Sequence, residues 1–436
     1  MTRNASIDRR VAGFGARLRI RHVAVPLAVT IALATLATSC TTTSDNDPLA
    51  VSSSAPTATS SARPLPTATT TTVPATTAPA ITVSATTVSA TTGPGTTSTT
   101  IDPVASTATS LAAGPVTTSA PGSPIVQPLQ PLAGPGGSDY EHGDWRVGSG
   151  GEGSDAWFVF EPIDPAPASA PVAIVMHGYF EFAGFDQMYE FIRHTVRHGT
   201  IVVYPRWQTD TAVPCPGPFD IEPCMASAMN GIDGALEYLA ADATRVQPEL
   251  DGASYFGFSF GGVITTNLVN RWQTLGLPEP EVVFLEDPHD GGLDGTGEPA
   301  LDDDLSGIPA STLLQCHSSA DGIIAGSPNS SCNAIFPELG HVPDENKDLV
   351  MARADNHGVP ALSSVHGVCA APPGTADAYD WNFCWKVWDA LRAAASDGDM
   401  SQFALGDTPE HRSNGLWSDG TPVAPLTIQD AAPIGP

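Results

Sequence analysis

Residues 254–265 read SYFGFSFGGVIT, and the remainder of the chain is interpreted outward from this stretch. At its centre is a G-x-S-x-G motif, Gly257-Phe258-Ser259-Phe260-Gly261. A short apolar run precedes the motif and a helix-like run, Val263–Leu275, follows it. A serine on such a sharp strand-to-helix turn needs small neighbours, because side chains at Gly257 or Gly261 would crowd the adjacent backbone. We therefore predict that Ser259 is a nucleophile, with the first N–H groups of the helix facing the group that it attacks.

Apolar runs and helical patterns alternate on both sides of this motif. Strands are expected at Ala156–Glu161, Val172–Met176, Thr200–Tyr204, Ser254–Phe258, Glu281–Leu285, Ser311–Cys316 and Asp348–Ala354. Helices are expected at Gln187–His198, Ala226–Ala241, Val263–Leu275 and Ala378–Ala395. Continuous apolar runs such as VAIVM are typical of strands that are buried on both faces of a sheet. The alternation predicts an α/β fold with a doubly wound, mostly parallel sheet.

The start of the chain has the layout of an export signal. Several arginines precede Val23–Ala37, an apolar run without charge that is too short to be a confident membrane-spanning helix. Small residues before Cys40 resemble the end of a bacterial lipobox, in which the cysteine is lipidated. Ordinary cleavage and free secretion are the alternative. We expect residues 1–40 to direct export, and the protein to be a cell-surface lipoprotein or a secreted protein.

A tether is expected between this signal and the folded domain. Residues 41–135 consist almost entirely of Thr, Ser, Ala, Pro, Gly and Val. Such a segment cannot bury enough apolar surface to offset the entropy lost on ordering, so a disordered stalk is predicted. The catalytic domain is then residues 136–436, and we expect it to meet a membrane only through the lipid anchor.

The charge balance excludes some classes of function. The chain has 47 acidic and 18 basic residues and a formal net charge of −29. Nucleic-acid binding is disfavoured, since it needs clustered Lys and Arg. The acidic stretch from Asp290 to Asp304 lacks the spacing of a calcium loop, and neither an H-E-x-x-H motif nor a P-loop is present. We expect no metal and no cofactor, and a monomeric protein.

Six cysteines follow Cys40, an even number that indicates disulfides in an exported protein. The sequence alone cannot choose among the possible pairings. Closeness along the chain favours Cys215–Cys224, Cys316–Cys332 and Cys369–Cys384. A metal site is the competing interpretation, but no C-x-x-C spacing supports it.

The order of these parts resembles the α/β-hydrolase superfamily, whose catalytic triad runs serine, acid, histidine along the chain. The resemblance extends over essentially the whole folded domain. In its motifs, His177-Gly178-Tyr179 and Ser259-Phe260, it is closest to the cutinase and polyester-hydrolase branch. It implies that the backbone N–H groups of Tyr179 and Phe260 form the oxyanion hole. It also implies that His177 packs beneath the loop in a structural role.

The resemblance further indicates where the acid and the base lie. Asp321, a few residues past the strand that ends near Cys316, is the preferred acid; Asp287, or Glu286, at the end of the preceding strand is the alternative. His357, just past the last strand, is the preferred base. His366 lies further along the same loop region and is the alternative, because it could reach the same place.

These residues predict an extracellular serine hydrolase that cleaves carboxylic esters through an acyl-enzyme intermediate. Six aromatic residues beside the motifs suit an apolar acyl or aryl ester, although each is also compatible with the core: Tyr179, Phe180, Phe182, Phe185, Trp207 and Phe258. The expected substrate is a small-molecule or lipid ester. The alternatives are an acyltransferase with the same triad and a catalytically inactive, stalked surface-binding module.

Overall fold

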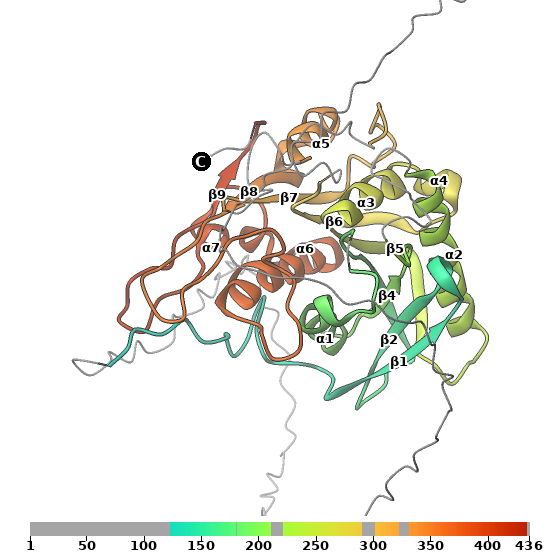
Figure 1. The fold of residues 1–436 in the computed structure, drawn as a ribbon, viewed down its shortest axis with the longest axis horizontal. Coiled ribbons are helices and arrows are strands. Elements are labelled where there is room, and N and C mark those ends of the chain that lie inside the picture. Colours follow the sequence, from blue (N-terminus) through green and yellow to red (C-terminus); the bar gives the residue numbers. More distant parts are fainter. Residues whose placement is uncertain (1–122, 180, 211–220, 290–300, 322–330, 434–436) are drawn as a thin grey trace, which may run out of the picture. The chain divides into compact units, whose positions relative to one another are not determined.

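The computed structural model describes residues 123–179, 181–210, 221–289, 301–321 and 331–433 (Figure 1). The predicted export signal, the lipidation site Cys40 and most of the stalk lie outside these ranges. Residues 123–135, which we expected in the stalk, contact the folded domain: the N–H group of Val126 donates to Ser418 Oγ at 3.0 Å, and that of Val359 donates to the carbonyl of Ile125 at 2.8 Å. The predicted start of the folded part at residue 136 is therefore too late.

One sheet of nine strands organises the described residues, in the order β1-β2-β4-β3-β5-β6-β7-β8-β9. Its strands are β1 (Asp144–Gly150), β2 (Trp157–Ile163), β3 (Ser169–Met176), β4 (Ile201–Pro205), β5 (Gln247–Phe258), β6 (Glu279–Glu286), β7 (Leu313–Ser319), β8 (Lys347–Ala352) and β9 (Thr427–Gln429). The six central strands pair in parallel, whereas β1, β2 and β9 are antiparallel to their neighbours. The predicted α/β fold with a mostly parallel sheet is confirmed.

The expected strands are all present, and two more lie at the edges of the sheet. Neither β1 nor β9 was predicted, because β1 (DWRVGSG) lacks the continuous apolar run of a central strand and β9 has only three residues. Strand β7 extends to Ser319, past its expected end at Cys316. This extension matters for the candidate site described below.

Seven α-helices occur in the described residues: α1 (Tyr189–Arg197), α2 (Glu222–Ala240), α3 (Phe260–Asn270), α4 (Trp272–Leu275), α5 (Cys332–Glu338), α6 (Trp385–Asp397) and α7 (Pro409–Arg412). The helix expected at Val263–Leu275 is divided into α3 and α4 at Arg271, and α5 and α7 were not predicted. The described helices include none that combines the length and the apolar character needed to span a bilayer.

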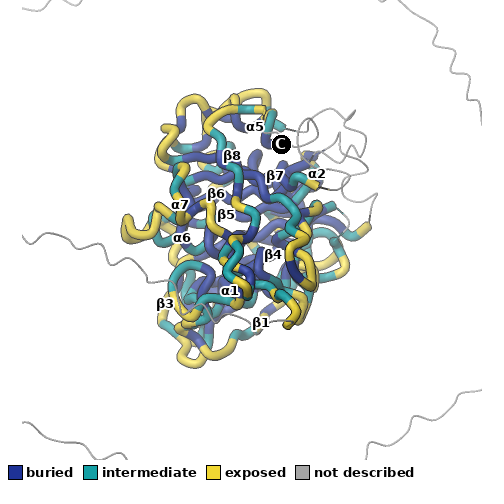
Figure 2. The backbone as a smooth tube through the Cα atoms, turned by 90° about the vertical axis from the view of Figure 1, so that its left-hand side faces the viewer, coloured by how far each residue is buried: buried dark blue, intermediate teal, exposed yellow. Residues whose placement is uncertain are grey.

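The helices cover both faces of the sheet (Figure 1). Each face has its own apolar cluster. Side chains of α2, α3 and α5 pack on one face, and those of α1 and α6 on the other. Strand β5 contributes side chains to both clusters, since successive side chains of a strand point to opposite faces of the sheet. Tyr255 belongs to the first cluster. Phe256 belongs to the second, and the centroid of its ring lies 4.3 Å from that of Phe191 of α1. The central strands are accordingly buried along most of their length (Figure 2).

Two of the three expected disulfides are present in the described residues. Cys316–Cys332 joins β7 to α5, and Cys369–Cys384 joins the segment after β8 to the short π-helix, Asp380–Cys384, that precedes α6. Cys215 lies outside the described residues, so its pairing with Cys224 stays a prediction. Each bridge closes a loop that the unfolded chain would otherwise leave free, a constraint that typically contributes about 2–4 kcal/mol.

Candidate active site

Ser259 occupies a strained turn between β5 and α3. Its backbone angles are φ 55° and ψ −128°, a combination that non-glycine residues rarely adopt. Neighbouring backbone holds the turn, because the Ser259 carbonyl accepts from the N–H groups of Gly262 at 2.8 Å and His289 at 3.1 Å. Strain that the surrounding structure maintains in this way is typical of a functional position.

The glycines beside Ser259 are required for the reason that the sequence suggested. A Cβ atom on Gly257 would lie 2.4 Å from Thr265 Oγ1, and one on Gly261 would lie 2.2 Å from the carbonyl oxygen of His177. Both distances are shorter than any side chain tolerates, so the strand, the turn and α3 approach one another only with glycine at these positions.

His366 lies within hydrogen-bond distance of the serine. Its Nε2 atom is 2.9 Å from Ser259 Oγ, and its ring packs 4.8 Å, between centroids, from that of Phe258. With a neutral imidazole protonated at Nδ1, the serine hydroxyl donates to Nε2. This is the arrangement in which an imidazole can take the hydroxyl proton.

Asp287 faces the other ring nitrogen of His366, Nδ1. Its Oδ2 atom is 3.6 Å from His366 Nδ1, somewhat longer than a hydrogen bond; such contacts are often long before a substrate is bound. Ser319 holds the carboxylate, because its N–H group donates to Oδ1 and its hydroxyl to Oδ2, each at 2.5 Å. Ser319 was not singled out from the sequence, since the strand that carries it was expected to end at Cys316.

The environment of Asp287 keeps it ionised although its side chain is only 2% exposed. Burial by itself would raise the pKa of this carboxyl, but the interaction with His366 and the Ser319 hydrogen bond outweigh burial and lower it. Glu286, the other alternative acid, is fully buried, and burial together with the charge of Asp287 raises its pKa well above the usual value. Glu286 accepts from the Cys369 N–H group at 3.3 Å.

The sheet explains why these side chains meet. Phe258 at the end of β5 pairs with Glu286 at the end of β6, which pairs with His317 near the end of β7. Ser259 and Asp287 each follow the last residue of their strand, so parallel pairing brings them to the same edge. The carboxyl ends of parallel strands are the usual position of sites in such sheets.

The preferred acid and base of the sequence analysis, Asp321 and His357, are not the partners of Ser259. The Asp321 carboxylate is exposed and accepts from the Ala354 N–H group at 2.9 Å. His357 Nε2 instead lies 2.8 Å from Asp419 Oδ2, on the surface. The alternatives, Asp287 and His366, are the residues that the structure brings together with Ser259.

The path of the chain after β8 explains this correction. Asp355 and Leu362 form an antiparallel bridge, with reciprocal backbone hydrogen bonds of 2.9 and 2.8 Å. His357 lies in the turn that this bridge closes, where its ring contacts Asp419 instead of Ser259. The Asp321 N–H group donates to the Ser364 carbonyl at 3.1 Å. His366, which follows this bridge along the chain, is the histidine that lies beside Ser259.

The two residues expected to supply the oxyanion hole lie beside Ser259. Phe260 is the first residue of α3, so its N–H group belongs to the first helical turn, which has no acceptor within the helix. Tyr179 follows Gly178, where an added Cβ would lie 3.3 Å from Ser259 Cβ. The rings of Tyr179 and Phe260 pack edge to face with their centroids 5.6 Å apart.

His177 has the structural surroundings that the sequence analysis expected. It is fully buried, its ring stacks on Trp207 with centroids 4.7 Å apart, and its Nε2 lies 2.5 Å from the Arg206 carbonyl oxygen. Burial lowers its pKa to about 4, so the ring is neutral. Phe185 likewise packs into the core, against Phe160 at 4.9 Å between centroids, while Phe180 lies outside the described residues.

Two groups of side chains among the described residues have ligand atoms within 4.8 Å of one another, a spacing that a metal ion could use. The first consists of His194, His198 and Asp389, and the second of Glu286, Asp287 and His317. In the first, His194 Nε2 already lies 2.8 Å from Asp389 Oδ2. In the second, Asp287 is held by Ser319 and faces His366. The aspartate carboxylate of each group thus already has a partner among the neighbouring side chains and backbone groups.

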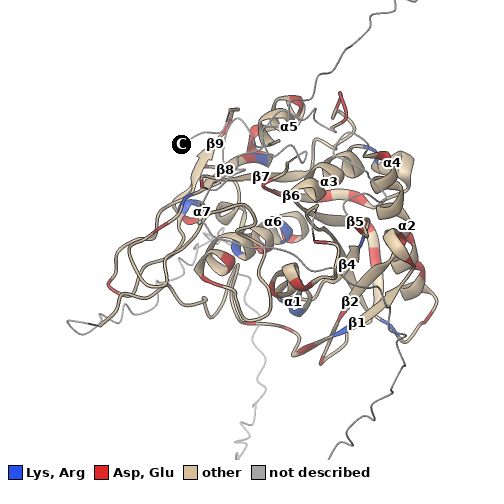
Figure 3. Ribbon diagram, in the orientation of Figure 1, with Lys and Arg blue, Asp and Glu red and all other residues tan. Residues whose placement is uncertain are grey.

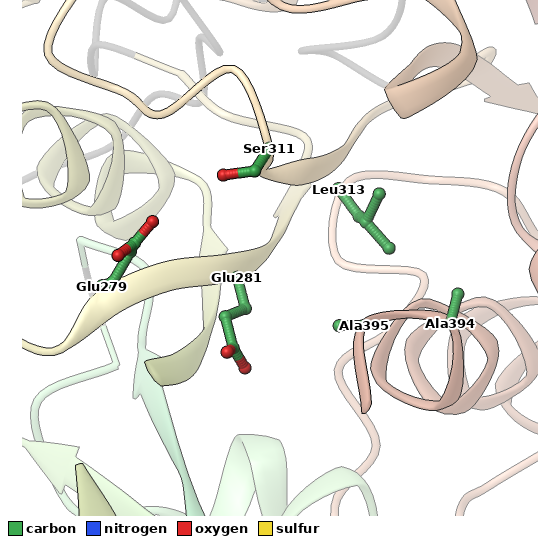
Figure 4. Close-up of a pocket in the computed structure, with 6 residues that line it drawn as sticks. All are labelled: Glu279, Glu281, Ser311, Leu313, Ala394 and Ala395. Atoms are coloured by element: carbon green, nitrogen blue, oxygen red, sulfur yellow. The ribbon is translucent and has the colours of Figure 1, made fainter. Parts of the chain in front are cut away.

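A separate hollow of about 330 Å³ lies away from Ser259, at the beginnings of β6 and β7 beside the end of α6 (Figure 4). It is lined by Glu279, Glu281, Ser311, Leu313, Ala394 and Ala395. Acidic residues also occur along β5 and α2 (Figure 3). Since the candidate triad is at the carboxyl ends of these strands, the hollow is at the opposite edge of the sheet and has no part in the site.

Comparisons with known proteins leave the site to be interpreted from its own geometry. No protein-family model matches the chain, and no curated protein matches it.

Proposed function

We propose that this protein is a serine hydrolase that cleaves carboxylic esters with Ser259, His366 and Asp287 as its catalytic triad. One observation carries the proposal: Ser259 Oγ, the two ring nitrogens of His366 and the Asp287 carboxylate follow one another at 2.9 and 3.6 Å. A hydroxyl, an imidazole and a buried, ionised carboxylate in this order are the parts of a nucleophile, a general base and its orienting group.

In the proposed reaction, Ser259 Oγ attacks the ester carbonyl carbon while His366 Nε2 accepts the hydroxyl proton. Asp287 stays ionised, favours the tautomer with the proton on Nδ1 and stabilises the imidazolium that forms. The N–H groups of Phe260 and Tyr179 donate to the oxyanion of the tetrahedral intermediate. His366 then protonates the leaving alcohol, and water attacks the acyl-enzyme by the same route in reverse.

The fold supports an assignment to the α/β-hydrolase type. The serine follows a central strand, β5, and the histidine lies on the segment after β8, in keeping with the resemblance seen in the sequence. The acid departs from the expected position, because Asp287 follows β6 rather than β7. The order serine, acid, histidine along the chain is kept.

We further propose that the enzyme works outside the cell, either secreted or held at the surface through Cys40 and the stalk. The disulfides Cys316–Cys332 and Cys369–Cys384 support an oxidising environment. Mass spectrometry of the mature protein tests the anchor: a diacylated Cys40 at the N-terminus supports it, and a free N-terminus at another residue contradicts it.

Hydrolysis of p-nitrophenyl esters over a series of acyl chain lengths tests the activity. The wild type should turn over at least one ester and should react with a fluorophosphonate probe. Ser259→Ala should lose at least about 10³-fold in kcat and all labelling, because the acyl-enzyme cannot form. If the folded wild type neither turns over esters nor takes the probe, the proposal fails and a surface-binding module becomes the better interpretation.

A further inference from the structure

Glu181 makes two hydrogen bonds to Gly178, the residue that precedes Tyr179. The N–H group of Glu181 donates to the Gly178 carbonyl at 3.2 Å, and the Glu181 carboxyl oxygen Oε2 accepts from the Gly178 N–H group at 3.1 Å. Backbone and side chain of Glu181 thus bind both polar groups of Gly178. The arrangement resembles the reciprocal bonding of a helix capping box, here in a loop that belongs to no helix.

These two bonds fix consecutive peptide units. The Gly178 N–H belongs to the peptide that links it to His177, and the Gly178 carbonyl belongs to the peptide that links it to Tyr179. Because a trans peptide is planar, holding the Gly178 oxygen also fixes the direction of the Tyr179 N–H group on the opposite side of the plane. That N–H group is one of the two proposed oxyanion donors.

The position of this turn makes its orientation matter for catalysis. Gly178 lies directly against the nucleophile, since a Cβ at that position would be 3.3 Å from Ser259 Cβ and 2.9 Å from Phe258 Cε1. No room remains there for a side chain that could hold the turn from within. His177 Nδ1 also lies 2.7 Å from the Gly178 carbonyl oxygen, so the contribution of the Glu181 side chain is its bond to the Gly178 N–H group, which it reaches from outside the turn.

The pKa of the Glu181 carboxyl is also affected by a residue of the candidate triad, His366. Burial raises the pKa of Glu181, while the Gly178 hydrogen bond and the charge of His366 oppose that effect. Glu181 is partly buried, and a hydrogen bond is electrostatically stronger inside a protein than in water.

We propose that Glu181 is a positioning residue of the oxyanion hole, which holds Gly178 so that the Tyr179 N–H group faces the oxyanion of the transition state. The inference rests on the proposed hydrolase activity. Its consequence is selective: loss of the Glu181 acceptor should weaken binding of the transition state and leave binding of the ground-state ester nearly unchanged.

Two variants of similar side-chain length distinguish the effect of losing the hydrogen-bond acceptor at position 181 from the effect of altered packing there. Glu181→Gln keeps a carbonyl oxygen for the Gly178 N–H group, whereas Glu181→Met fills similar space without an acceptor. We expect Glu181→Met to lower kcat about 10- to 100-fold with KM changed less than about threefold, since one disordered oxyanion donor costs at most about 10²–10³. Glu181→Gln should stay within about threefold of the wild type. Glu152→Ala, at an exposed position, is the control for a glutamate replacement that alters nothing at the site.

A trifluoromethyl ketone provides the second measurement, because its adduct with the serine carries an oxyanion like that of the transition state. Its inhibition constant should rise in Glu181→Met by the same factor by which kcat falls, and circular dichroism should show unchanged unfolding temperatures for Gln and Met variants. The inference is overturned if Met and Gln behave alike, or if Met raises KM instead of lowering kcat. An inert wild type would overturn the hydrolase proposal itself, so the two failures are distinguishable.

Discussion

The segment after β8 contains two histidines that each face a carboxylate, and the two pairs differ in their surroundings. His357 lies 2.8 Å from Asp419 with both side chains about one-third exposed, at 35% and 32%. His366 lies 3.6 Å from Asp287, with exposures of 19% and 2%. The pair with the shorter contact is on the surface, and the pair with the longer contact is beside Ser259.

The comparison shows that a close carboxylate does not by itself place a histidine beside Ser259. Asp419 is oriented by the Thr421 N–H group and by His357, which lower its pKa to about 2. Asp287 faces an imidazole whose other nitrogen is 2.9 Å from a strained serine. Contact with Ser259 is what separates the two pairs.

The most direct test of whether His366 or His357 serves Ser259 is to replace each histidine in turn. We expect His366→Ala to lower kcat/KM for a p-nitrophenyl ester by about 10³–10⁵-fold, because Ser259 loses the base that takes its proton. His357→Ala should stay within about twofold of the wild type. Equal losses in the two variants, or a larger loss in His357→Ala, would contradict the proposed triad.

Replacing the carboxylates tests the acids in the same way. Asp287→Asn should lower kcat by about 10²–10⁴-fold, since the amide no longer favours the Nδ1-protonated tautomer of His366. Because the pKa of Asp287 is lowered, this carboxyl should not titrate between pH 5 and 9 in the wild-type pH–rate profile. Asp419→Asn serves as the matched control and should leave kcat unchanged. A fully active Asp287→Asn enzyme would require another acid.

The two described disulfides allow the comparison to be extended to the loop that holds His366. Cys369–Cys384 fixes the chain three residues beyond His366, whereas Cys316–Cys332 fixes α5 to β7. Paired alanine replacements of either bridge should lower the free energy of unfolding by about 2–5 kcal/mol. Only the Cys369/Cys384 replacement should also reduce kcat, by about tenfold, at a temperature where both variants are folded. Urea unfolding together with kinetics separates these effects, and equal kinetic losses would show that the bridge does not position His366.

The smallest expected effect concerns the surface pair. The folded-state pKa of Asp419, about 2, is below its ordinary value of 3.8, so its interactions stabilise the fold above about pH 4 and are lost as the pH falls toward 2. The urea midpoint of Asp419→Asn should therefore be slightly lower than that of the wild type at pH 6, and the difference should shrink between pH 4 and 3. A difference that grows on acidification would contradict the assigned direction of the pKa shift.

Much of this protein follows from local sequence. The apolar runs of β3, β4 and β6 identify buried strands, and the glycines on either side of Ser259 mark a turn that no larger residue could make. These features depend on neighbouring residues, so their pattern can be read along the chain. The pairing of Cys316 with Cys332 and of Cys369 with Cys384 also agreed with simple closeness.

The partners of the serine were decided by the tertiary structure alone. The sequence offered three acids and two histidines, and the order of the motifs favoured Asp321 and His357. The bridge between Asp355 and Leu362 reverses the chain and delivers His366, while parallel pairing of β5 with β6 brings Asp287 to the same edge. A catalytic base must lie within about 3 Å of its nucleophile, and residues so far apart in sequence reach that distance only through the path of the folded chain.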